Sequence, residues 1–179
     1  MNLIWVHVVA VVVDAKQQPT KSNILSFSMN YWLMKSEPEC YSIDDLKKQK
    51  IGHWDGVRNY QARNILRDQM KKGDLAFFYY SNSKPSGIAG IVKIVKEGYW
   101  DHTAADPKSE HPDPDSTPEN PRWYMVDVEF VKKFDSVIPL SVLKNASELR
   151  GMKLLQKGDR LSVQPVRENE WKWICDNFA

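Results

Sequence analysis

The sequence predicts an α+β fold, a small mixed β-barrel with short helices between and beside its strands. Two observations lead to this prediction. Several short apolar segments rich in aromatic and β-branched residues are separated by turn signals, among them Lys72-Gly73-Asp74 and Lys157-Gly158-Asp159. The helical patterns between them are short and do not alternate regularly with strands, so a doubly wound sheet is not expected. At 179 residues the chain fits one domain with a core of its own.

The first 28 residues differ in composition from the rest of the chain. Residues 3–13 form an apolar run that only His7 interrupts, and a polar stretch follows as far as Ser28. The run is about half as long as a membrane-spanning helix and lacks the positively charged start of a signal peptide. We therefore expect residues 1–28 to be an extension outside a domain that covers residues 29–179. An extra strand docked on the domain is the first alternative, and a secretion signal is the second.

A strand and two helices are expected in the first part of the domain. Residues 31–34 form a short aromatic and aliphatic run typical of a buried strand. Ser42 is followed by a carboxylate three residues later, at Asp45, which predicts the start of a helix. Asn59 is expected to cap a second helix. The apolar stripe of this second helix consists of Ala62, Ile65, Leu66 and Met70.

The middle of the chain predicts two strands and a long loop. Residues 75–80 are almost entirely apolar and aromatic, and residues 88–95 are rich in β-branched side chains. Between Gly98 and Arg122 the chain is rich in Pro, Asp, His and Ser, which is too polar and too proline-rich for a regular element. Loops of this length in small domains often serve as lids or binding loops.

The last part of the chain predicts a strand, a helical stretch, a second strand and a final helix. Residues 123–130 alternate between apolar and polar side chains, as in a half-exposed strand. One or two helical turns are expected within residues 141–149. Another alternating strand is expected over residues 161–166. Asn169 is expected to cap a final helix that carries Trp171.

Composition and motifs exclude several classes of function. Lys and Arg number 25 against 23 Asp and Glu, so nucleic-acid binding would need a shaped site or a local basic patch. Cys40 and Cys175 are far apart, which argues against a disulfide scaffold or a zinc knuckle. The chain contains no dinucleotide-binding, P-loop, zincin or nucleophile-elbow motif. Acidic and histidine side chains of the proline-rich segment lie at no recognised metal-ligand spacing, so no cofactor and no metal are expected: Asp101, His102, Asp106, His111, Asp113 and Asp115.

Polar side chains recur where the expected elements end. Such groups follow the strands over residues 31–34 and 75–80 and precede the helix capped by Asn59. If the strands form one small barrel, these ends can converge on one side, and Trp54 can supply a ring for stacking. A planar polar ligand needs this combination of a flat apolar surface and fixed donors and acceptors. Without a nucleophile or a metal set, the pattern indicates a binding pocket and not an enzyme.

Five ordered blocks of the chain carry a resemblance to a known family. They are Trp32-Leu33-Met34-Lys35-Ser36-Glu37-Pro38, the stretch from Trp54 to Arg63, Gly73-Asp74, Phe78-Tyr79-Tyr80-Ser81-Asn82 and Leu161-Ser162-Val163-Gln164-Pro165-Val166. Together they resemble the EVE domain family, over nearly the whole of residues 29–179. The resemblance implies a PUA-like barrel, related to YTH and ASCH domains, that binds nucleic acid in a pocket for a flipped or unpaired modified base. Modified cytosines are the leading ligands that it implies, so the expected partner is DNA or RNA with a modified base.

The family motifs map a pocket onto this chain residue by residue. Trp54 would stack on the base, Glu37 or an Asn carbonyl would accept from an exocyclic amine, and Lys35 or Arg58 would meet a base carbonyl or a phosphate. Arg63 and Arg67, four residues apart on one helix, would follow the nucleic-acid backbone, although a solvated helix face explains that pair equally. The implied pocket residues are Lys35, Ser36, Glu37, Trp54, Val57, Arg58, Asn59, Ser81, Asn82, Ser162 and Gln164.

Three other functions remain open from the sequence. The main alternative is a PUA-like module that recognises structured or single-stranded RNA. A small nucleotide hydrolase and an interaction module without a nucleic-acid ligand are the others. The expected location is the cytoplasm, or the nucleus if the source is eukaryotic, with no membrane partner.

Overall fold

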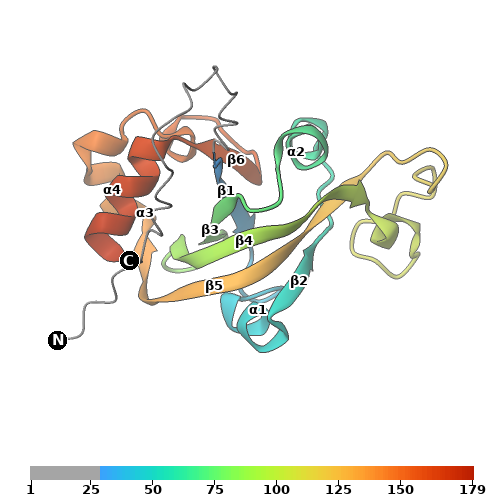
Figure 1. Cartoon of the computed structure of the whole chain (residues 1–179), viewed down its shortest axis with the longest axis horizontal. Helices are drawn as coiled ribbons and strands as arrows, with labels where there is room; N and C mark the ends of the chain where they lie inside the picture. The colour runs from blue at the N-terminus through green and yellow to red at the C-terminus, as the bar shows by residue number, and fades with distance from the viewer. Residues whose placement is uncertain (1–28) are drawn as a thin grey trace, which may run out of the picture.

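The fold is organised around one six-stranded mixed sheet (Figure 1). The computed structural model describes residues 29–179, so the expectations for residues 1–28 lie outside the described part. The strand order is β2-β5-β4-β3-β1-β6. Strands β1 and β3 pair in parallel, and the other neighbouring pairs are antiparallel. The strands are β1 (Tyr31–Ser36), β2 (Ile51–Trp54), β3 (Leu75–Tyr80), β4 (Gly87–Trp100), β5 (Tyr124–Pro139) and β6 (Val163–Val166).

The prediction of a mixed α+β fold is confirmed, but the sheet is not a closed barrel. A barrel needs a hydrogen-bonded ladder between its first and last strands. Among residues 29–179, β2 pairs only with β5 and β6 pairs only with β1, so both are edge strands of the described sheet. The long strands β4 and β5 still curve the sheet, because their pairing contains several register shifts. The result is a curled, open sheet.

Short helices cover both faces of this sheet. They are α1 (Ile43–Gln49), α2 (Tyr60–Asn64), the π-helical turn η1 (Ile65–Gln69), α3 (Leu140–Asn145) and α4 (Glu168–Phe178). Three 3-10 turns complete the set: η2 (His102–Ala105), η3 (Ser147–Leu149) and η4 (Lys153–Leu155). Along β1, Trp32 and Met34 belong to one buried cluster and Leu33 to another, as the two-residue period of a strand requires. The first cluster includes side chains of α1, α2 and η1, and the second includes side chains of α3 and α4.

Two of the three predicted helix caps are confirmed. The Ser42 hydroxyl accepts from the Asp45 backbone N–H at 3.1 Å, and the Asp45 carboxylate accepts from the Ser42 N–H. The Asn59 side chain accepts from two backbone N–H groups of α2. The prediction for Asn169 was wrong, because α4 begins at Glu168 and Asn169 lies inside it. The buried Glu170 carboxylate accepts from the Arg167 backbone N–H at 2.9 Å, which moves the helix start ahead of Asn169.

Several strand boundaries also differ from the predictions. Strand β2 was not expected, and the last strand is shorter than the interval 161–166. Strands β4 and β5 are longer than expected. Strand β4 continues to Trp100, which pairs with Tyr124, and β5 continues to Pro139, which pairs with Gly87. The segment that joins them has only the short turn η2 as a regular element and extends from one end of the molecule (Figure 1). Among residues 29–179, no helix has the length and apolar character needed to cross a membrane.

Candidate functional site

A cavity of about 490 Å³ opens where β1 and β2 end. One wall comes from the ends of these strands and the turn after β1. The opposite wall comes from the long segment between β4 and β5, which contributes Glu110 and His111. Of the side chains that the sequence predicts for a pocket, Lys35, Ser36 and Trp54 line this cavity. The other lining residues are Cys40, Tyr41, Gln49, His53, Asp55, Gly56, Glu110 and His111.

Trp54 is both a core residue and a cavity residue. Its exposed fraction is only 6%, and it meets Phe78 edge-to-face, with ring centroids 5.2 Å apart and planes at 82°. The sequence suggests a ring that faces a cleft, and the structure buries most of that ring in the first core cluster. Only the remaining part borders the cavity. Removing this side chain therefore affects the stability of the fold as well as the cavity.

Tyr41 supplies a second aromatic surface that the sequence did not predict. Its hydroxyl donates to the Gln49 side chain at 2.7 Å, and its ring lies 6.3 Å from the ring of Phe78. The Tyr41 hydroxyl packs against Gly52 of β2, and a Cβ added at position 52 would lie 2.0 Å from the hydroxyl oxygen. Only glycine fits under this ring, so Gly52 helps to place Tyr41 beside the cavity. The one available signal was an aromatic residue directly before the Ser42 helix cap.

Lys35 places an ammonium group in the cavity wall. Burial lowers the pKa of this lysine, and the nearby Asp159 carboxylate opposes that change. Among the described residues, Lys35 forms no ion pair within 4.0 Å. Its backbone N–H donates to the Ser162 carbonyl at 2.8 Å, which fixes its strand against the segment before β6. A half-buried ammonium without an anionic partner is a ready donor for a ligand oxygen.

The predicted groups at the ends of β1 and β3 hold each other beside the cavity. The Ser81 backbone N–H donates to the Ser36 carbonyl at 2.9 Å, and the Asn82 amide donates to the Glu37 carboxylate at 2.6 Å. The Ser36 hydroxyl donates to the Tyr41 carbonyl at 2.8 Å, which ties the end of β1 to the cavity turn. Glu37, Ser81 and Asn82 therefore lie beside the rim but do not line the cavity.

Four further predicted pocket residues lie outside the cavity lining. Val57 is buried in the core, and Asn59 caps α2. Ser162 contributes its carbonyl to Lys35. Gln164 is 1% exposed, and its amide donates to the Leu161 carbonyl at 3.0 Å. None of these four lines the cavity.

The predicted backbone-tracking arginines lie on α2 and η1, outside the cavity. Arg63 donates to the Arg122 carbonyl at 2.7 Å, and its guanidinium lies 5.1 Å from the centre of the Tyr60 ring. Arg67 forms two hydrogen bonds, of 2.7 and 2.8 Å, with the neighbouring Asp68 carboxylate. Because both side chains have partners, a phosphate would have to compete for them.

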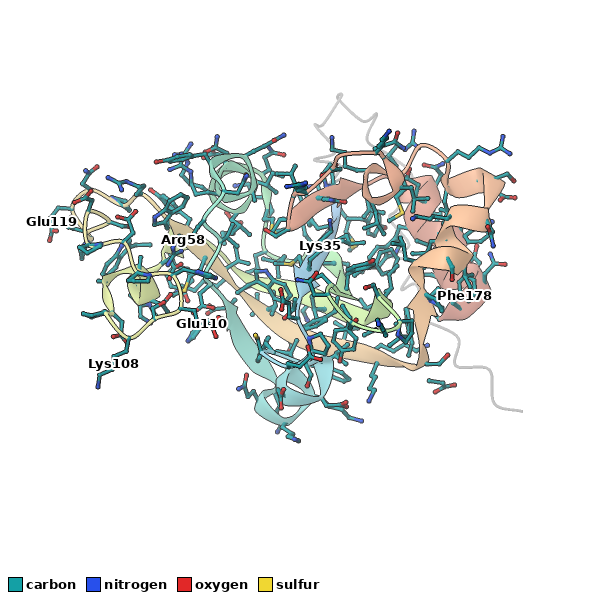
Figure 2. The ribbon with its side chains drawn as sticks, turned by 180° about the vertical axis from the view of Figure 1, so that it is seen from behind. Lys35, Arg58, Lys108, Glu110, Glu119 and Phe178 are labelled. Carbon is teal, nitrogen blue, oxygen red and sulfur yellow. The ribbon has the colours of Figure 1, made fainter. Side chains whose placement is uncertain are left out.

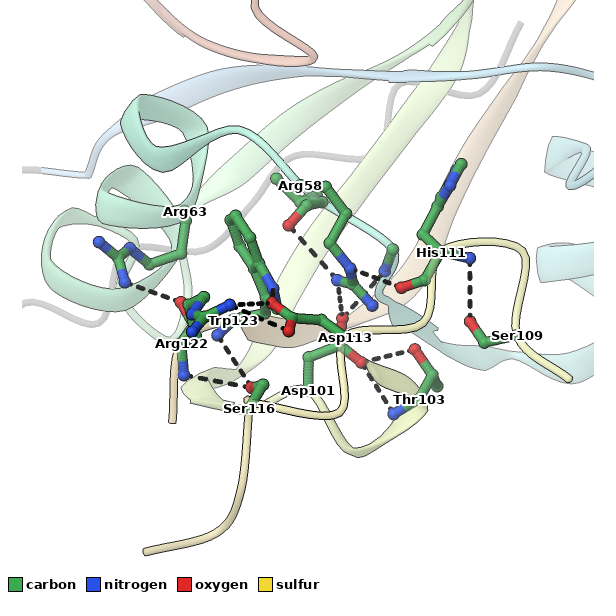
Figure 3. Close-up of polar contacts among 12 residues, drawn as sticks. Arg58, Arg63, Asp101, Thr103, Ser109, His111, Asp113, Ser116, Arg122 and Trp123 are labelled. Carbon is green, nitrogen blue, oxygen red and sulfur yellow. Dashed lines mark hydrogen bonds and ion pairs between the residues drawn. The ribbon is translucent and has the colours of Figure 1, made fainter. Parts of the chain in front are cut away.

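Arg58 connects the turn after β2 to the long segment (Figure 3). Its Nη1 donates to Asp101 at 2.7 Å, and its Nε donates to the His111 carbonyl at 2.8 Å. Asp101 is fully buried and also accepts from the Gly56 N–H at 3.1 Å. Burial by itself would raise the pKa of Asp101, but hydrogen bonds from Thr103 and the Arg58 partner outweigh burial and hold that pKa below its ordinary value. The carboxylate is therefore charged at neutral pH.

The cavity contains a thiol and an imidazole that bear on catalysis. Desolvation raises the pKa of the Cys40 thiol, and Glu110, Glu37 and Glu39 raise it further. A protonated thiol is a poor nucleophile. The His53 imidazole is paired with Asp127, at 2.9 Å. Within residues 29–179, no three His, Cys, Asp or Glu side chains are grouped in a way that could hold a metal ion.

Comparisons with known proteins identify the family. The EVE domain model matches residues 30–177. Thymocyte nuclear protein 1 from Homo sapiens is 45% identical, over 92% of this chain and 82% of the human protein. A crystal structure of a Pseudomonas syringae protein is 50% identical and covers 82% of this chain and 98% of its own, with a TM-score of 0.79. The human protein in complex with DNA that contains 5-methylcytosine is 46% identical and covers 83% of this chain and 96% of its own, with a TM-score of 0.76. With this match over almost all of its described residues, the chain belongs to the EVE domain family.

Proposed function

We propose that this protein binds nucleic acid and holds an unpaired or flipped base, a modified cytosine before others, in the cavity beside Lys35 and Trp54. The observation that carries the proposal is the half-buried Lys35 ammonium next to two aromatic surfaces in a cavity of about 490 Å³, with no ion-pair partner for it in the described part of the chain. Pockets for small ligands usually measure about 300–1,000 Å³. The human relative, solved with DNA that contains 5-methylcytosine, supports the same ligand class.

The cavity offers partners for each part of a cytosine. Trp54 and Tyr41 provide aromatic surface for the base plane. Lys35 can donate to the base carbonyl or to a phosphate, and the Asp55 or Glu110 carboxylate can accept from the exocyclic amine. Such contacts are needed because extruding a base from a duplex costs a few kcal/mol. The predicted acceptor Glu37 acts from the rim, where Asn82 orients its carboxylate.

This function needs binding and no reaction, so we propose a recognition module and not an enzyme. The protonated state of the Cys40 thiol supports this proposal. We also propose that residues 29–179 form the binding domain and that residues 1–28 lie outside it, which the family match over residues 30–177 supports. If the source is eukaryotic, the names of the thymocyte nuclear relatives support a nuclear location.

The test is an affinity series with oligonucleotides that differ at one position. Fluorescence anisotropy is measured with cytosine, 5-methylcytosine or thymine at that position, in single-stranded and duplex DNA and in RNA. Thymine carries the same methyl group but has a carbonyl where cytosine has an amine. We expect the tightest binding to 5-methylcytosine DNA. Equal affinity for all bases would contradict the proposal, and tight RNA binding that ignores the modification would favour the RNA-binding alternative.

A matched pair of lysine variants links the affinity to the cavity. Lys35→Met should weaken binding of the 5-methylcytosine oligonucleotide about tenfold or more, because a hydrogen bond from a charged group contributes about 1.5–3 kcal/mol. Lys144→Met removes the same charge from the exposed side of α3, outside the cavity. We expect this control to bind within about twofold of the original protein. Equal effects of the two variants would show that Lys35 acts only through net charge.

A further inference from the structure

The outer wall of the cavity is made by a segment with little structure of its own. Glu110 and His111 belong to the chain between β4 and β5, where the turn η2 is the only regular element. Figure 2 shows Glu110 near Arg58 at the base of this segment, and Lys108 and Glu119 toward its outer end. Backbone hydrogen bonds fold this segment on itself, such as the one from the Asp113 N–H to the Ala104 carbonyl at 2.8 Å. Side-chain anchors connect the folded segment to the turn beside the cavity.

Two carboxylates anchor the segment (Figure 3). Asp113 accepts from Arg122 at 2.9 Å and from the Trp123 indole at 2.6 Å, which fixes the return of the chain to β5. Asp101 accepts from Arg58 at 2.7 Å and from the Thr103 hydroxyl at 2.6 Å. The first anchor holds the segment to its own end, whereas the second connects it to the turn after β2.

The Asp101 anchor reaches two residues of the cavity lining. Its carboxylate accepts from the Gly56 N–H, and its partner Arg58 donates to the His111 carbonyl. Gly56 adopts φ +70°, and a Cβ added there would lie 3.7 Å from the His111 ring. The same ion pair, in which the Asp101 carboxylate is fully buried and the Arg58 side chain is 17% exposed, therefore holds both cavity residues.

An ion pair with a fully buried carboxylate and a largely buried guanidinium is an unfavourable way to stabilise a loop. Removing charged groups from water is costly, and well-packed apolar side chains often stabilise a fold as well or better. Nη2 of Arg58 is buried and has no hydrogen-bond partner among the residues that the structure describes, so the arrangement is not optimal for stability. The pair does fix the orientation of the cavity lining, because its hydrogen bonds hold the Gly56 amide and the His111 carbonyl at the same time.

We propose that Asp101 and Arg58 form a positioning pair, which sets the outer wall of the cavity and thereby its affinity for a modified base. The inference rests on the proposed function of the cavity. Arg58 then acts through the wall and not by direct contact with a phosphate or base. Asp101, which does not line the cavity, becomes a determinant of binding.

The test compares Asp101→Asn with Asp74→Asn, two neutralised buried carboxylates. Asp74 is 3% exposed and accepts from the Trp32 indole at 2.8 Å, close to the start of β1. The cavity lies at the other end of that strand, roughly 15 Å away for five residues of strand. Both variants should lose stability. Per folded molecule, Asp101→Asn should bind the 5-methylcytosine oligonucleotide about tenfold or more weakly, whereas Asp74→Asn should bind within about twofold of the original protein.

A second measurement reports on the wall itself. Amide hydrogen exchange of residues 102–116 should rise in Asp101→Asn and stay unchanged in Asp74→Asn. If Asp101→Asn does not fold, Thr103→Val removes one hydrogen bond to the same carboxylate and should lower affinity in the same direction, by about threefold.

The outcomes separate this inference from the proposed function. If the original protein does not prefer the modified cytosine, the proposed function fails. If it does, but Asp101→Asn binds equally well per folded molecule, the positioning role is overturned, because binding then does not need the carboxylate. Tighter binding would overturn it too, and would indicate that Arg58, released from Asp101, contacts the ligand directly.

Discussion

Replacing Trp54 by alanine should reduce both stability and affinity, by amounts that the structure lets us separate. The ring is 6% exposed and packs edge-to-face on Phe78. Truncating a buried Trp to Ala costs about 3–5 kcal/mol. For a domain of 150–250 residues, each kcal/mol lowers the Tm by about 2–4 °C, so we expect a drop of roughly 6–20 °C. Domains have total stabilities of about 5–15 kcal/mol, so the variant stays folded if the original protein exceeds about 5 kcal/mol, and affinity is best measured at low temperature.

The affinity effect comes from the part of the ring that borders the cavity. Base–aromatic stacking contributes about 1–3 kcal/mol, so the affinity should fall by roughly 5- to 150-fold. Urea unfolding followed by circular dichroism gives the stability. Fluorescence anisotropy with a 5-methylcytosine oligonucleotide gives the affinity, corrected for the folded fraction at the temperature of measurement.

Trp171→Ala is the matched control for this variant. Trp171 is also 6% exposed, but it stacks on Phe77 at 4.1 Å and on Tyr31 at 4.7 Å in the second core cluster, away from the cavity. It should lose a similar amount of stability and keep its affinity per folded molecule. If Trp54→Ala also keeps its affinity, the ring does not stack on a base. If it loses less than about 1 kcal/mol of stability, the account of its burial is wrong.

Three further predictions concern the whole domain. A chain that begins at Met29 should keep its Tm within a few degrees, since a change of about 1 kcal/mol moves it by only 2–4 °C; loss of cooperative unfolding would show that residues 1–28 are integral. With a net charge of +2, binding of unmodified duplex DNA should be weak, and a salt series should indicate only a few phosphate contacts; a slope equivalent to eight or more would contradict a pocket-dominated mode. The pKa of Asp101 is lower in the folded state than its unfolded value of about 3.9. Its contribution to stability is therefore complete above the unfolded pKa and is lost as the pH falls through the folded-state pKa. Asp101→Asn should flatten this acid limb of the stability–pH curve.

Local chemistry was the most predictable part of this fold. Ser42 and Asn59 act as caps because their short side chains carry an oxygen that accepts from the free backbone N–H groups of the first helical turn. The same rule failed at Asn169. There the Glu170 carboxylate accepts from the Arg167 backbone N–H, so the helix starts at Glu168, before Asn169. The sequence around Asn169 does not show which of two neighbouring side chains will form this bond.

Contacts between distant residues were the least predictable part. Arg58 and Asp101 are 43 positions apart, and only the fold brings them together. The sequence presents Arg58 as a free cation and Asp101 as one of many loop carboxylates. Strand β2 was missed for a similar reason, because four residues that include a glycine become a strand only through pairing with β5.

The meeting of polar groups at the ends of β1 and β3, beside the cavity, has a topological cause. Strands β1 and β3 are the one parallel pair among the described strands, so their carboxyl ends, Ser36 and Tyr80, lie side by side at the same end of the strands. The residues that follow them must leave the sheet side by side, and the hydrogen bond between Asn82 and Glu37 shows that they do. In an antiparallel pair the two carboxyl ends would lie at opposite ends of the ladder. The clustering that the sequence suggested at strand ends thus depends on β1 and β3 running in parallel, which no local pattern in either strand encodes.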